Sequence, residues 1–285
     1  MSTSDPPERQ PVTRRSLQRR KLTEAQPEAA AVDEIAVEEP LEIRVAGDTL
    51  ATIMRTPGED HFLTAGFLFA EGVIAELADL GKIAHCGRPS DAGYGNMVDV
   101  APGPGVALAP ERTSERRGTI VGSACGLCGR ERIDDLLARL TPLARGTSFG
   151  MAALAHSIEQ LAEVQGTFAR TGAVHGALAL DASAQLLAFG EDVGRHNAVD
   201  KVVGKLLYSE ALTRTRADAQ LLAVSGRTSF EIVQKAASAR IGLVISVSGP
   251  TSLAIDTAEA LGITLVGFAR GDAFNVYTHP GRITD

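Results

Sequence analysis

The stretch LLAVSGRTSFEIVQKAASARIGLVISVSGPTSLAIDTAEALGITLVGF, residues 221–268, decides the fold class of this chain. Short apolar runs that favour strands alternate in it with segments of helical length and spacing. In order, these are residues 221–224, 229–239, 243–247, 252–261 and 264–268. Strands that are separated by helices of about ten residues form parallel βαβ units. The stretch therefore predicts an α/β fold.

The residues before this stretch extend the same pattern. Two apolar runs, 177–180 and 185–189, flank a turn at Asp181-Ala-Ser and predict a pair of strands. One helix is predicted near 151–165. Another is predicted from apolar residues that share one helical face: Val199, Val202, Val203, Leu206 and Leu207. We therefore assign residues 151–285 to an α/β subdomain.

Residues 37–150 predict an α+β subdomain. Apolar and polar residues alternate in 41–45 and 49–54 around a Gly-Asp turn, which predicts a hairpin. Asp60 is a suitable N-cap for an apolar helix over residues 61–77. The further predicted elements are a strand at 96–106, a charged loop at 111–117 and a helix that begins near Arg130.

Residues 1–36 are predicted to be a disordered tail, basic and then acidic. The arginines at 14–15 and 19–20 are similar to a twin-arginine export signal. The residues that follow them, Leu-Thr-Glu-Ala-Gln-Pro-Glu, lack the apolar segment that such a signal needs. We therefore expect a cytoplasmic protein. No run of about eighteen apolar residues occurs, so no membrane span is expected.

The composition argues against a nucleic-acid partner. The formal net charge is −7, and aromatic residues make up 4% of the chain, with no Trp. Neutralising a phosphate backbone needs clustered Lys and Arg, and single-stranded nucleic acid is usually held on aromatic side chains. A local basic pocket for a small phosphate-bearing ligand is compatible with these numbers.

The sequence Cys125-Gly-Leu-Cys128 is the first candidate site. Two intervening residues place both sulfurs on one turn, and the helix predicted to follow directs the positive end of its dipole toward them. This environment favours the thiolate over the thiol. A stabilised thiolate is able to accept sulfur from a persulfide, and the second cysteine is able to expel that sulfur by forming a disulfide.

Other interpretations of the dithiol are open. Half of a zinc site is one, although a closed site needs four ligands and the chain has a single further cysteine, Cys86. A thioredoxin-type redox pair and an inert buried pair are the others. Zinc-deaminase chemistry is excluded, because Ala124 stands where that motif has proline and His175-Gly-Ala lacks its glutamate. No metal site is expected.

Ser225-Gly-Arg-Thr-Ser and Ser248-Gly-Pro-Thr-Ser, 23 residues apart, are the second candidate site. Each follows a predicted strand and begins a predicted helix, where glycine lets a ligand approach and backbone amides bind anions. Ligands of open α/β sheets sit beyond the carboxyl ends of the strands, so two such loops suggest a ligand with more than one phosphate. Alternatively, the hydroxyls only cap the helices.

Two further segments are rich in polar groups. The third predicted strand runs into Gly267-Phe-Ala-Arg-Gly-Asp, where Arg270 is able to bind a phosphate and Asp272 a guanine edge. A surface ion pair between the two is the alternative. Residues 190–201 are dense in charged groups and glycines, which favours a polar cleft over a solvated helix face, and His196 is the candidate for handling a proton.

Together these motifs resemble the formate dehydrogenase accessory sulfurtransferase family, FdhD. The resemblance runs from the region of residue 37 to the end of the chain. It rests on CGLCG at 125–129, GEDVGRHNAVDKVVG at 190–204, SGRTSFE at 225–231 and VGFARGD at 266–272, with EPLEI at 39–43 and MRTPG at 54–58.

The resemblance implies a cytidine-deaminase-like fold with three layers and a mixed sheet, and a homodimer. It implies that Cys125 receives persulfide sulfur from a cysteine desulfurase, with Cys128 as its essential neighbour. The cargo would be the molybdenum (or tungsten) bis-molybdopterin guanine dinucleotide cofactor, which is sulfurated before insertion into formate dehydrogenase. Its binding residues would be Phe268, Ala269, Arg270, Gly271, Asp272 and Ala273. A non-enzymatic cofactor chaperone with a structural dithiol is the alternative.

Overall fold

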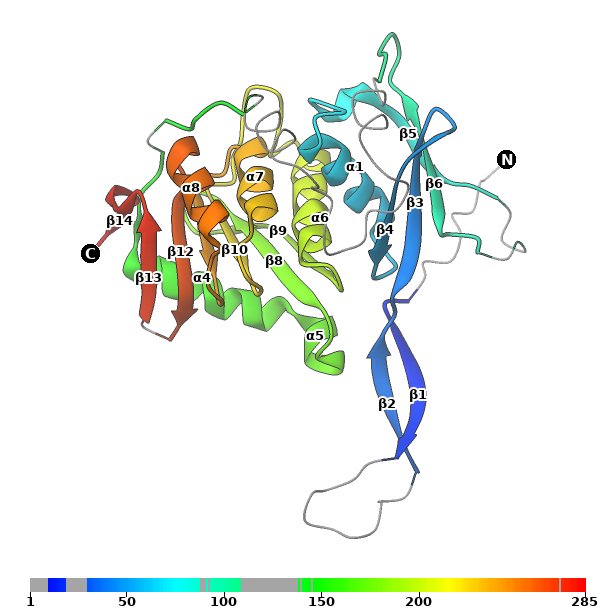
Figure 1. Ribbon diagram of the computed structural model, residues 1–285, viewed down its shortest axis with the longest axis horizontal. Helices are drawn as coiled ribbons and strands as arrows, with labels where there is room; N and C mark the ends of the chain where they lie inside the picture. Colours follow the sequence, from blue (N-terminus) through cyan, green and yellow to red (C-terminus); the bar gives the residue numbers. More distant parts are fainter. Residues whose placement is uncertain are drawn as a thin grey trace.

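The computed structural model describes residues 10–18, 30–87, 91, 93–108, 138, 140–144, 146–271 and 273–285. Its larger sheet has six strands in the order β13-β12-β11-β10-β8-β9 (Figure 1). Their bounds are β8 His175–Leu180, β9 Leu186–Asp192, β10 Leu221–Val224, β11 Leu243–Ser246, β12 Thr264–Arg270 and β13 Ala273–Thr278. Strands β10, β11 and β12 are parallel, as predicted, whereas β8 pairs with β10 in the antiparallel sense.

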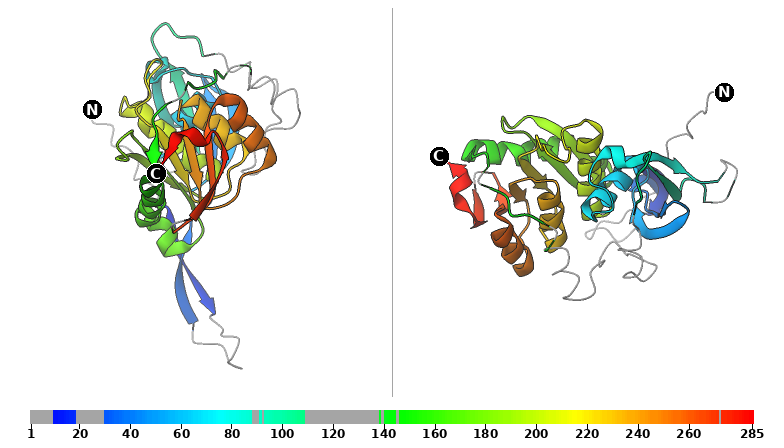
Figure 2. Two further views of the ribbon diagram at one scale, coloured as in Figure 1. Left: turned by 90° about the vertical axis from the view of Figure 1, so that its left-hand side faces the viewer. Right: turned by 90° about the horizontal axis from the view of Figure 1, so that it is seen from above.

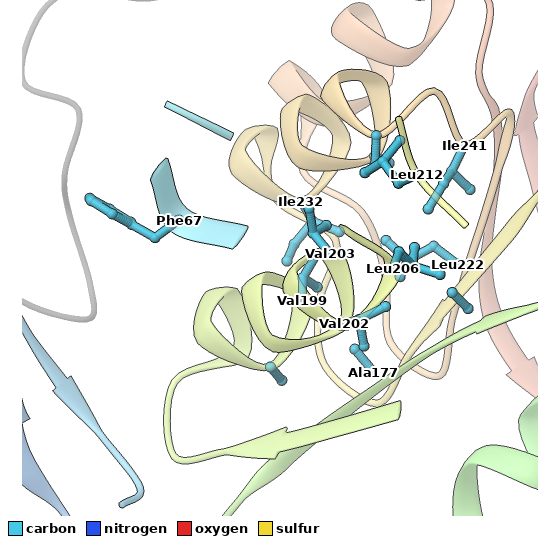
Figure 3. Close-up of a cluster of buried hydrophobic side chains, with 14 of the residues drawn as sticks. Phe67, Ala177, Val199, Val202, Val203, Leu206, Leu212, Leu222, Ile232 and Ile241 are labelled. Atoms are coloured by element: carbon cyan, nitrogen blue, oxygen red, sulfur yellow. The ribbon is translucent and has the colours of Figure 1, made fainter. Parts of the chain in front are cut away.

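Helices cover both faces of this sheet. Helix α4 (Met151–Val164) lies on one face, and α6 (Arg195–Tyr208), α7 (Phe230–Ser238) and α8 (Ser252–Leu261) lie on the other (Figures 1 and 2). Successive residues of β10 point to opposite faces. Leu221 packs in the cluster around α4, and Leu222 packs with α6 and α7 (Figure 3). The predicted three-layer α/β class with a mixed sheet is confirmed.

The smaller sheet has four strands in the order β4-β3-β6-β5. Their bounds are β3 Glu39–Val45, β4 Asp48–Arg55, β5 Leu80–His85 and β6 Met97–Pro102. The predicted hairpin corresponds to β3 and β4. The strand predicted at 96–106 ends at Pro102, because a turn follows at residues 104–105 in which Gly105 has φ +74°.

The helix predicted over residues 61–77 is shorter, since α1 spans Asp60–Ala70. The chain turns at Glu71-Gly72, where Gly72 has a φ of +72° that favours glycine. Asp60 is the first helical residue and does not cap the helix. Its carboxylate instead accepts two hydrogen bonds from Arg55, at 2.9 and 3.1 Å. The short remaining elements are α5 Gly166–Thr171, β7 Phe149–Gly150, β14 Ile283–Thr284 and the 3-10 turns Leu77–Asp79 and Pro280–Arg282.

Helices α1 and α6 join the two sheets at a close crossing. A Cβ on Gly66 would lie 1.9 Å from the carbonyl oxygen of Asp200, and a Cβ on Gly204 would lie 2.0 Å from that of Phe62. The two backbones are therefore in direct contact. Buried apolar residues of β3, α1, α6 and the large sheet form one continuous core, part of which appears in Figure 3.

The N-terminal segment differs from the predicted disordered tail. Strands β1 (Val12–Gln18) and β2 (Ala30–Ala36) form an antiparallel ribbon that extends away from the body (Figure 1). Opposite charges face each other across the ribbon, with Arg14 opposite Glu34 and Arg15 opposite Asp33. Such cross-strand pairs stabilise a ribbon. Along the described residues, no helix is long and apolar enough to cross a bilayer.

Candidate functional site: a basic edge of the sheet

The carboxyl ends of β10, β11 and β12 lie at one edge of the large sheet, where α7 and α8 begin. Because β8 is antiparallel to β10, its first residue, His175, lies at this edge too. Strand β9 ends there, and α6 begins directly after it. This arrangement brings residues from five segments to one end of the sheet, which is where α/β sheets bind ligands.

Phe268 marks the end of β12. The pairing of β12 with β13 is irregular between Gly267 and Arg270, and Phe268 has a φ of +54°. A β-bulge of this kind redirects a side chain. Phe268 is 50% exposed, yet its ring packs on the loop that contains Gly249, since a Cβ on Gly249 would lie 2.6 Å from the ring carbon Cζ.

The remaining predicted cofactor residues follow Phe268 along the chain. Ala269 is buried, Arg270 and Ala273 are exposed and pair across the hairpin, and Gly271 forms the turn with φ +57°. Asp272 lies outside the described residues. An exposed aromatic residue, Phe268, and an exposed arginine, Arg270, thus both lie at the end of β12.

The two Ser-Gly-x-Thr-Ser loops touch each other. The Thr228 amide donates to the Gly249 carbonyl at 3.3 Å, and the Thr251 amide donates to the Thr228 carbonyl at 3.0 Å. The first loop is also tied to β8, because the Ser225 hydroxyl accepts from the Gly176 amide at 2.9 Å. The predicted neighbourhood of the two loops is confirmed.

Basic groups gather around the first loop. A Cβ on Gly226 would lie 3.2 Å from Nδ1 of His175 and 3.7 Å from Cβ of Arg195. Burial lowers the pKa of His175, and the charges of Arg195, His196 and Arg227 lower it further. Burial and the charge of Arg227 likewise lower the pKa of Arg195. These shifts indicate a local excess of positive charge that an anion would relieve.

His196 faces α7. Its Nε2 atom lies 2.8 Å from Oε2 of Glu231 and 3.0 Å from the Ser229 hydroxyl. Burial lowers the pKa of His196, the hydrogen bond and charge of Glu231 oppose this shift, and the charges of Arg195 and Lys235 add to it, so the pKa lies below its ordinary value. Burial also opposes the ionisation of Glu231, but the hydrogen bond and charge of His196 bring its pKa below the ordinary value. His196 is thus held by a carboxylate through Nε2.

Two charged groups of the segment 190–201, Asp192 and Lys201, form a buried pair. Asp192 is fully buried and pairs with Lys201 at 2.8 Å. The same carboxylate accepts from the amides of Thr56 and Gly194 at 3.1 and 2.9 Å, and from the Asn197 side chain at 2.8 Å. These groups therefore join the segment after the small sheet's strand β4 to α6.

Two side chains of α6 also donate hydrogen bonds to backbone carbonyls of the preceding segments. The Lys201 ammonium donates to the carbonyls of Thr56 and Glu191 at 3.2 and 2.9 Å. The Asn197 side chain donates to the Met54 carbonyl at 2.8 Å. The MRTPG motif is thus bound to the GEDVGRHN motif by backbone carbonyls and buried side chains, which gives both motifs a structural purpose.

The predicted dithiol, Cys125 and Cys128, lies outside the described residues. Cys86 is a free, half-buried thiol, and burial and the charge of Asp99 raise its pKa. Within the described residues, no group of three or more His, Cys, Asp or Glu side chains is placed to hold a metal ion.

Fold and site together define an α/β protein with a basic, hydroxyl-bearing edge that is suited to anionic ligands. The chain matches the model of the FdhD/NarQ family over residues 36–284. The chain therefore belongs to the FdhD/NarQ family, as its motifs predicted.

Relatives of similar length support this assignment. The sulfur carrier protein FdhD of Anaeromyxobacter dehalogenans (strain 2CP-C) is 52% identical over 258 residues, which cover 89% of this chain and 90% of the relative. The protein of the same name from Mycobacterium tuberculosis is 43% identical over 257 residues, or 88% and 91% of the two chains. A crystal structure from Desulfotalea psychrophila, described as a formate dehydrogenase accessory protein, matches with a TM-score of 0.72 at 23% identity. It covers 96% of this chain and 99% of its own, and shows the fold alone.

Sequence reasoning missed the place of His175 in this site. In the sequence, His175 was compared only with the zinc-deaminase motif. The alternation of strands and helices does not reveal that β8 runs antiparallel to its neighbours β10 and β9, which brings His175 to this edge. The available signal was its position directly before a strand that carries Gly176-Ala-Leu-Ala-Leu. Arg195 is one of the charged groups in the segment 190–201, and the sequence does not distinguish it from the others.

Proposed function

We propose that this chain is a sulfur carrier for the maturation of formate dehydrogenase. In this proposal it takes persulfide sulfur from a cysteine desulfurase onto Cys125 and transfers it to the molybdenum bis-molybdopterin guanine dinucleotide cofactor. The observation that carries the proposal is the basic sheet edge beside Phe268 and Arg270, which suits the phosphates and bases of such a cargo. The names of relatives at 43–52% identity support the sulfur-carrier role.

The sulfur moves in two balanced steps. The Cys125 thiolate attacks the outer sulfur of the desulfurase persulfide, and the desulfurase cysteine leaves as a thiolate. The Cys128 thiolate then attacks the inner sulfur of the Cys125 persulfide. A disulfide forms between the two cysteines, and the outer sulfur leaves as sulfide, which the metal of the cargo receives. The cysteine pair supplies the two electrons, so the chain acts as a sulfurtransferase.

The cargo would bind at the sheet edge through Phe268–Ala273. The Phe268 ring is exposed and offers a surface on which a guanine base stacks. Arg270 is exposed and offers a fork of donors to a phosphate. The proposal further includes a cytoplasmic location, a homodimer and the formate dehydrogenase catalytic subunit as the final recipient.

The test is the intact mass of the protein after incubation with a cysteine desulfurase and cysteine. The parent should gain the mass of one sulfur atom, reductant should reverse the gain, and Cys125→Ala should show none. Cys86→Ala is the matched control and should load like the parent. A folded parent that binds guanine nucleotide but never gains sulfur would replace the carrier by a passive cofactor chaperone with a structural dithiol.

A further inference from the structure

The ribbon β1–β2 leaves the body beside the edge where the carboxyl ends of the large sheet lie. Helix α5 is at that edge, because Glu191 near the end of β9 accepts hydrogen bonds from the Thr167 and Phe168 amides, both at 2.8 Å. Strand β2 lies against α5, where the Arg170 guanidinium donates two hydrogen bonds to the Glu34 carboxylate at 2.8 and 3.1 Å. The ribbon projects past this edge (Figures 1 and 2). A protein that docks on the ribbon is therefore next to the edge that faces the proposed cargo.

Strand β1 has an open edge. Within the described part of the chain, its seven residues pair with β2 alone. Where β1 begins, Gln10 and Pro11 line a cavity of about 260 Å³ together with residues of α5 and α6, so this end of the strand is not packed tightly on the body. The outward N–H and C=O groups of such a strand are a template for one more strand. A ribbon of two strands is only marginally stable by itself and is stabilised by a third.

The charges of the ribbon leave two arginines of β1 for a partner. Glu34 lies opposite Arg14, but it makes its two short hydrogen bonds with Arg170, while Arg14 is 3.7 Å away with 78% of its side chain exposed. Asp33 lies opposite Arg15, but its carboxylate accepts from the Glu34 amide at 3.0 Å. Arg15 is exposed and forms no ion pair with a described residue. Three guanidinium groups thus meet two carboxylates here, and the surplus positive charge lies on β1.

We propose that β1 is the docking strand for the protein that receives the cargo, and that it binds an extended acidic segment of that protein by strand addition. Successive residues of a strand point to opposite faces, so Arg14 and Arg15 pair with two acidic residues that are adjacent in the added strand. By the register of the ribbon, Val32 shares the face of Arg14 and Ile35 the face of Arg15. Val32 is 64% exposed and Ile35 40%, and both offer apolar contacts to the partner. The inference rests on the proposed function, because the partner is the recipient of the sulfurated cofactor.

Biolayer interferometry with the full chain and the immobilised, cofactor-free catalytic subunit of formate dehydrogenase tests the docking strand. The double variant Arg14→Gln/Arg15→Gln should bind about fivefold or more weakly than the parent at low ionic strength, because two charge pairs are lost. Added salt should weaken the parent more than the variant, since it screens those pairs. Arg216→Gln removes an exposed arginine from the body and is the matched control. It should change the affinity by less than about twofold.

Amide hydrogen exchange, read by mass spectrometry on the same samples, tests the mode of binding. In the complex, exchange of the β1 amides should slow, because the outward N–H groups of β1 gain partners in the added strand. Strand β13, the edge strand at the far end of the large sheet, should exchange as it does in the free protein. In the free proteins, β1 and β2 should exchange equally in the parent and the double variant, which shows that the ribbon is still formed.

Equal affinity of the parent and the double variant for the subunit would overturn the docking strand. The same holds if the complex forms without slower exchange in β1. It holds too if light scattering shows that the double variant loses a dimer of the parent, since the ribbon then binds a second copy of this chain. Sulfur loading of Cys125 separates the two ideas. Loading without a ribbon effect removes the docking strand alone, and a ribbon effect without loading removes the sulfur-carrier function alone.

Discussion

Lys201 and Asp192 form an ion pair that is buried between the two sheets, with exposed side-chain fractions of 2% and 0%. Each partner is completed by backbone groups, so neither charge is left without a hydrogen bond. Removing one partner of such a pair leaves the other charge buried without compensation, which typically lowers the free energy of unfolding by about 3–5 kcal/mol.

We expect Lys201→Met to lower the free energy of unfolding by about 3 kcal/mol or more, because the Asp192 carboxylate stays buried without its cation. Urea denaturation followed by circular dichroism measures the change. Arg216→Met is the control, since its ion pair with Asp218 is exposed and contributes little. If Lys201→Met lowers the free energy of unfolding by less than about 1 kcal/mol, the Asp192 carboxylate is not left buried without compensation, and the expectation is wrong.

Asp200 supplies a pH-dependent term. Burial raises its pKa to about 6, against the opposing charge of Lys235, whose ammonium lies 2.6 Å away. The folded state therefore binds a proton more tightly than the unfolded state, in which the pKa is near 3.8. The contribution of Asp200 to the free energy of unfolding is therefore greatest below the unfolded pKa near 3.8, and it is lost as the pH rises through about 6.

Asp200→Asn should remove this dependence, because an amide does not titrate. The difference in unfolding free energy, parent minus variant, should fall between pH 4 and 6 and level off above pH 7. Urea titrations of both proteins at half-unit pH steps measure it. A difference that rises over the same window would contradict a raised pKa of Asp200.

At the scale of elements, the crossing of α1 and α6 depends on two glycines. Any side chain at Gly66 or Gly204 meets a backbone carbonyl of the other helix, which is unable to move aside as a flexible side chain does. A side chain added at either glycine pushes the two helices apart. The loss of packing then extends along the whole contact between α1 and α6.

We expect Gly66→Ala and Gly204→Ala each to lower the free energy of unfolding by about 2 kcal/mol or more. Gly166→Ala in α5 is the matched control, since nothing lies within 4 Å of its added Cβ. That change should be neutral or slightly stabilising. Chemical denaturation measures all three, and equal stability of the Gly66 variant and the control would contradict direct helix contact.

The elements also show what the sequence is able to predict. Strands β10, β11 and β12 with α7 and α8 agree closely with their predicted ranges, because buried apolar runs and helical spacing are local signals. The purpose of Asp192 and Lys201 was not predictable in the same way. A charged residue in a glycine-rich segment gives the same local signal whether it faces a ligand or a buried partner that is 136 residues away in the chain.

The same limit applied to the site. The grouping of the two loops and Phe268 followed from parallel strands that share one edge, so it was predictable. The basic surroundings of the first loop were not, since they depend on His175 and Arg195 arriving from an antiparallel strand and from α6. The ribbon β1–β2 was missed because the basic and then acidic residues that pair across it are, in the sequence alone, typical of a disordered tail.

At the scale of the whole molecule, the ribbon is a separate addition to the body. Its strands pair with each other, and β2 lies against α5, where Glu34 forms an exposed ion pair with Arg170. The family match begins at residue 36. Deleting residues 1–36 should therefore cost about 1 kcal/mol or less.

Urea denaturation and the sulfur-loading assay, run on the full and shortened chains, check this expectation. The shortened chain should keep both its denaturation midpoint and its capacity to gain one sulfur. A loss of more than about 3 kcal/mol would instead make the ribbon part of the folded core.

The junction between the MRTPG segment and α6 has a consequence for how the chain can be divided. The glycine crossing and the Asp192 network are non-covalent contacts that join the two sheets in addition to the covalent connection near residues 140–148. A chain that is cut in this connection should remain one particle, and two separately expressed pieces should find each other. The molecule is thus suited to a split reporter, in which reassembly of the two pieces is read out as their co-elution in size-exclusion chromatography.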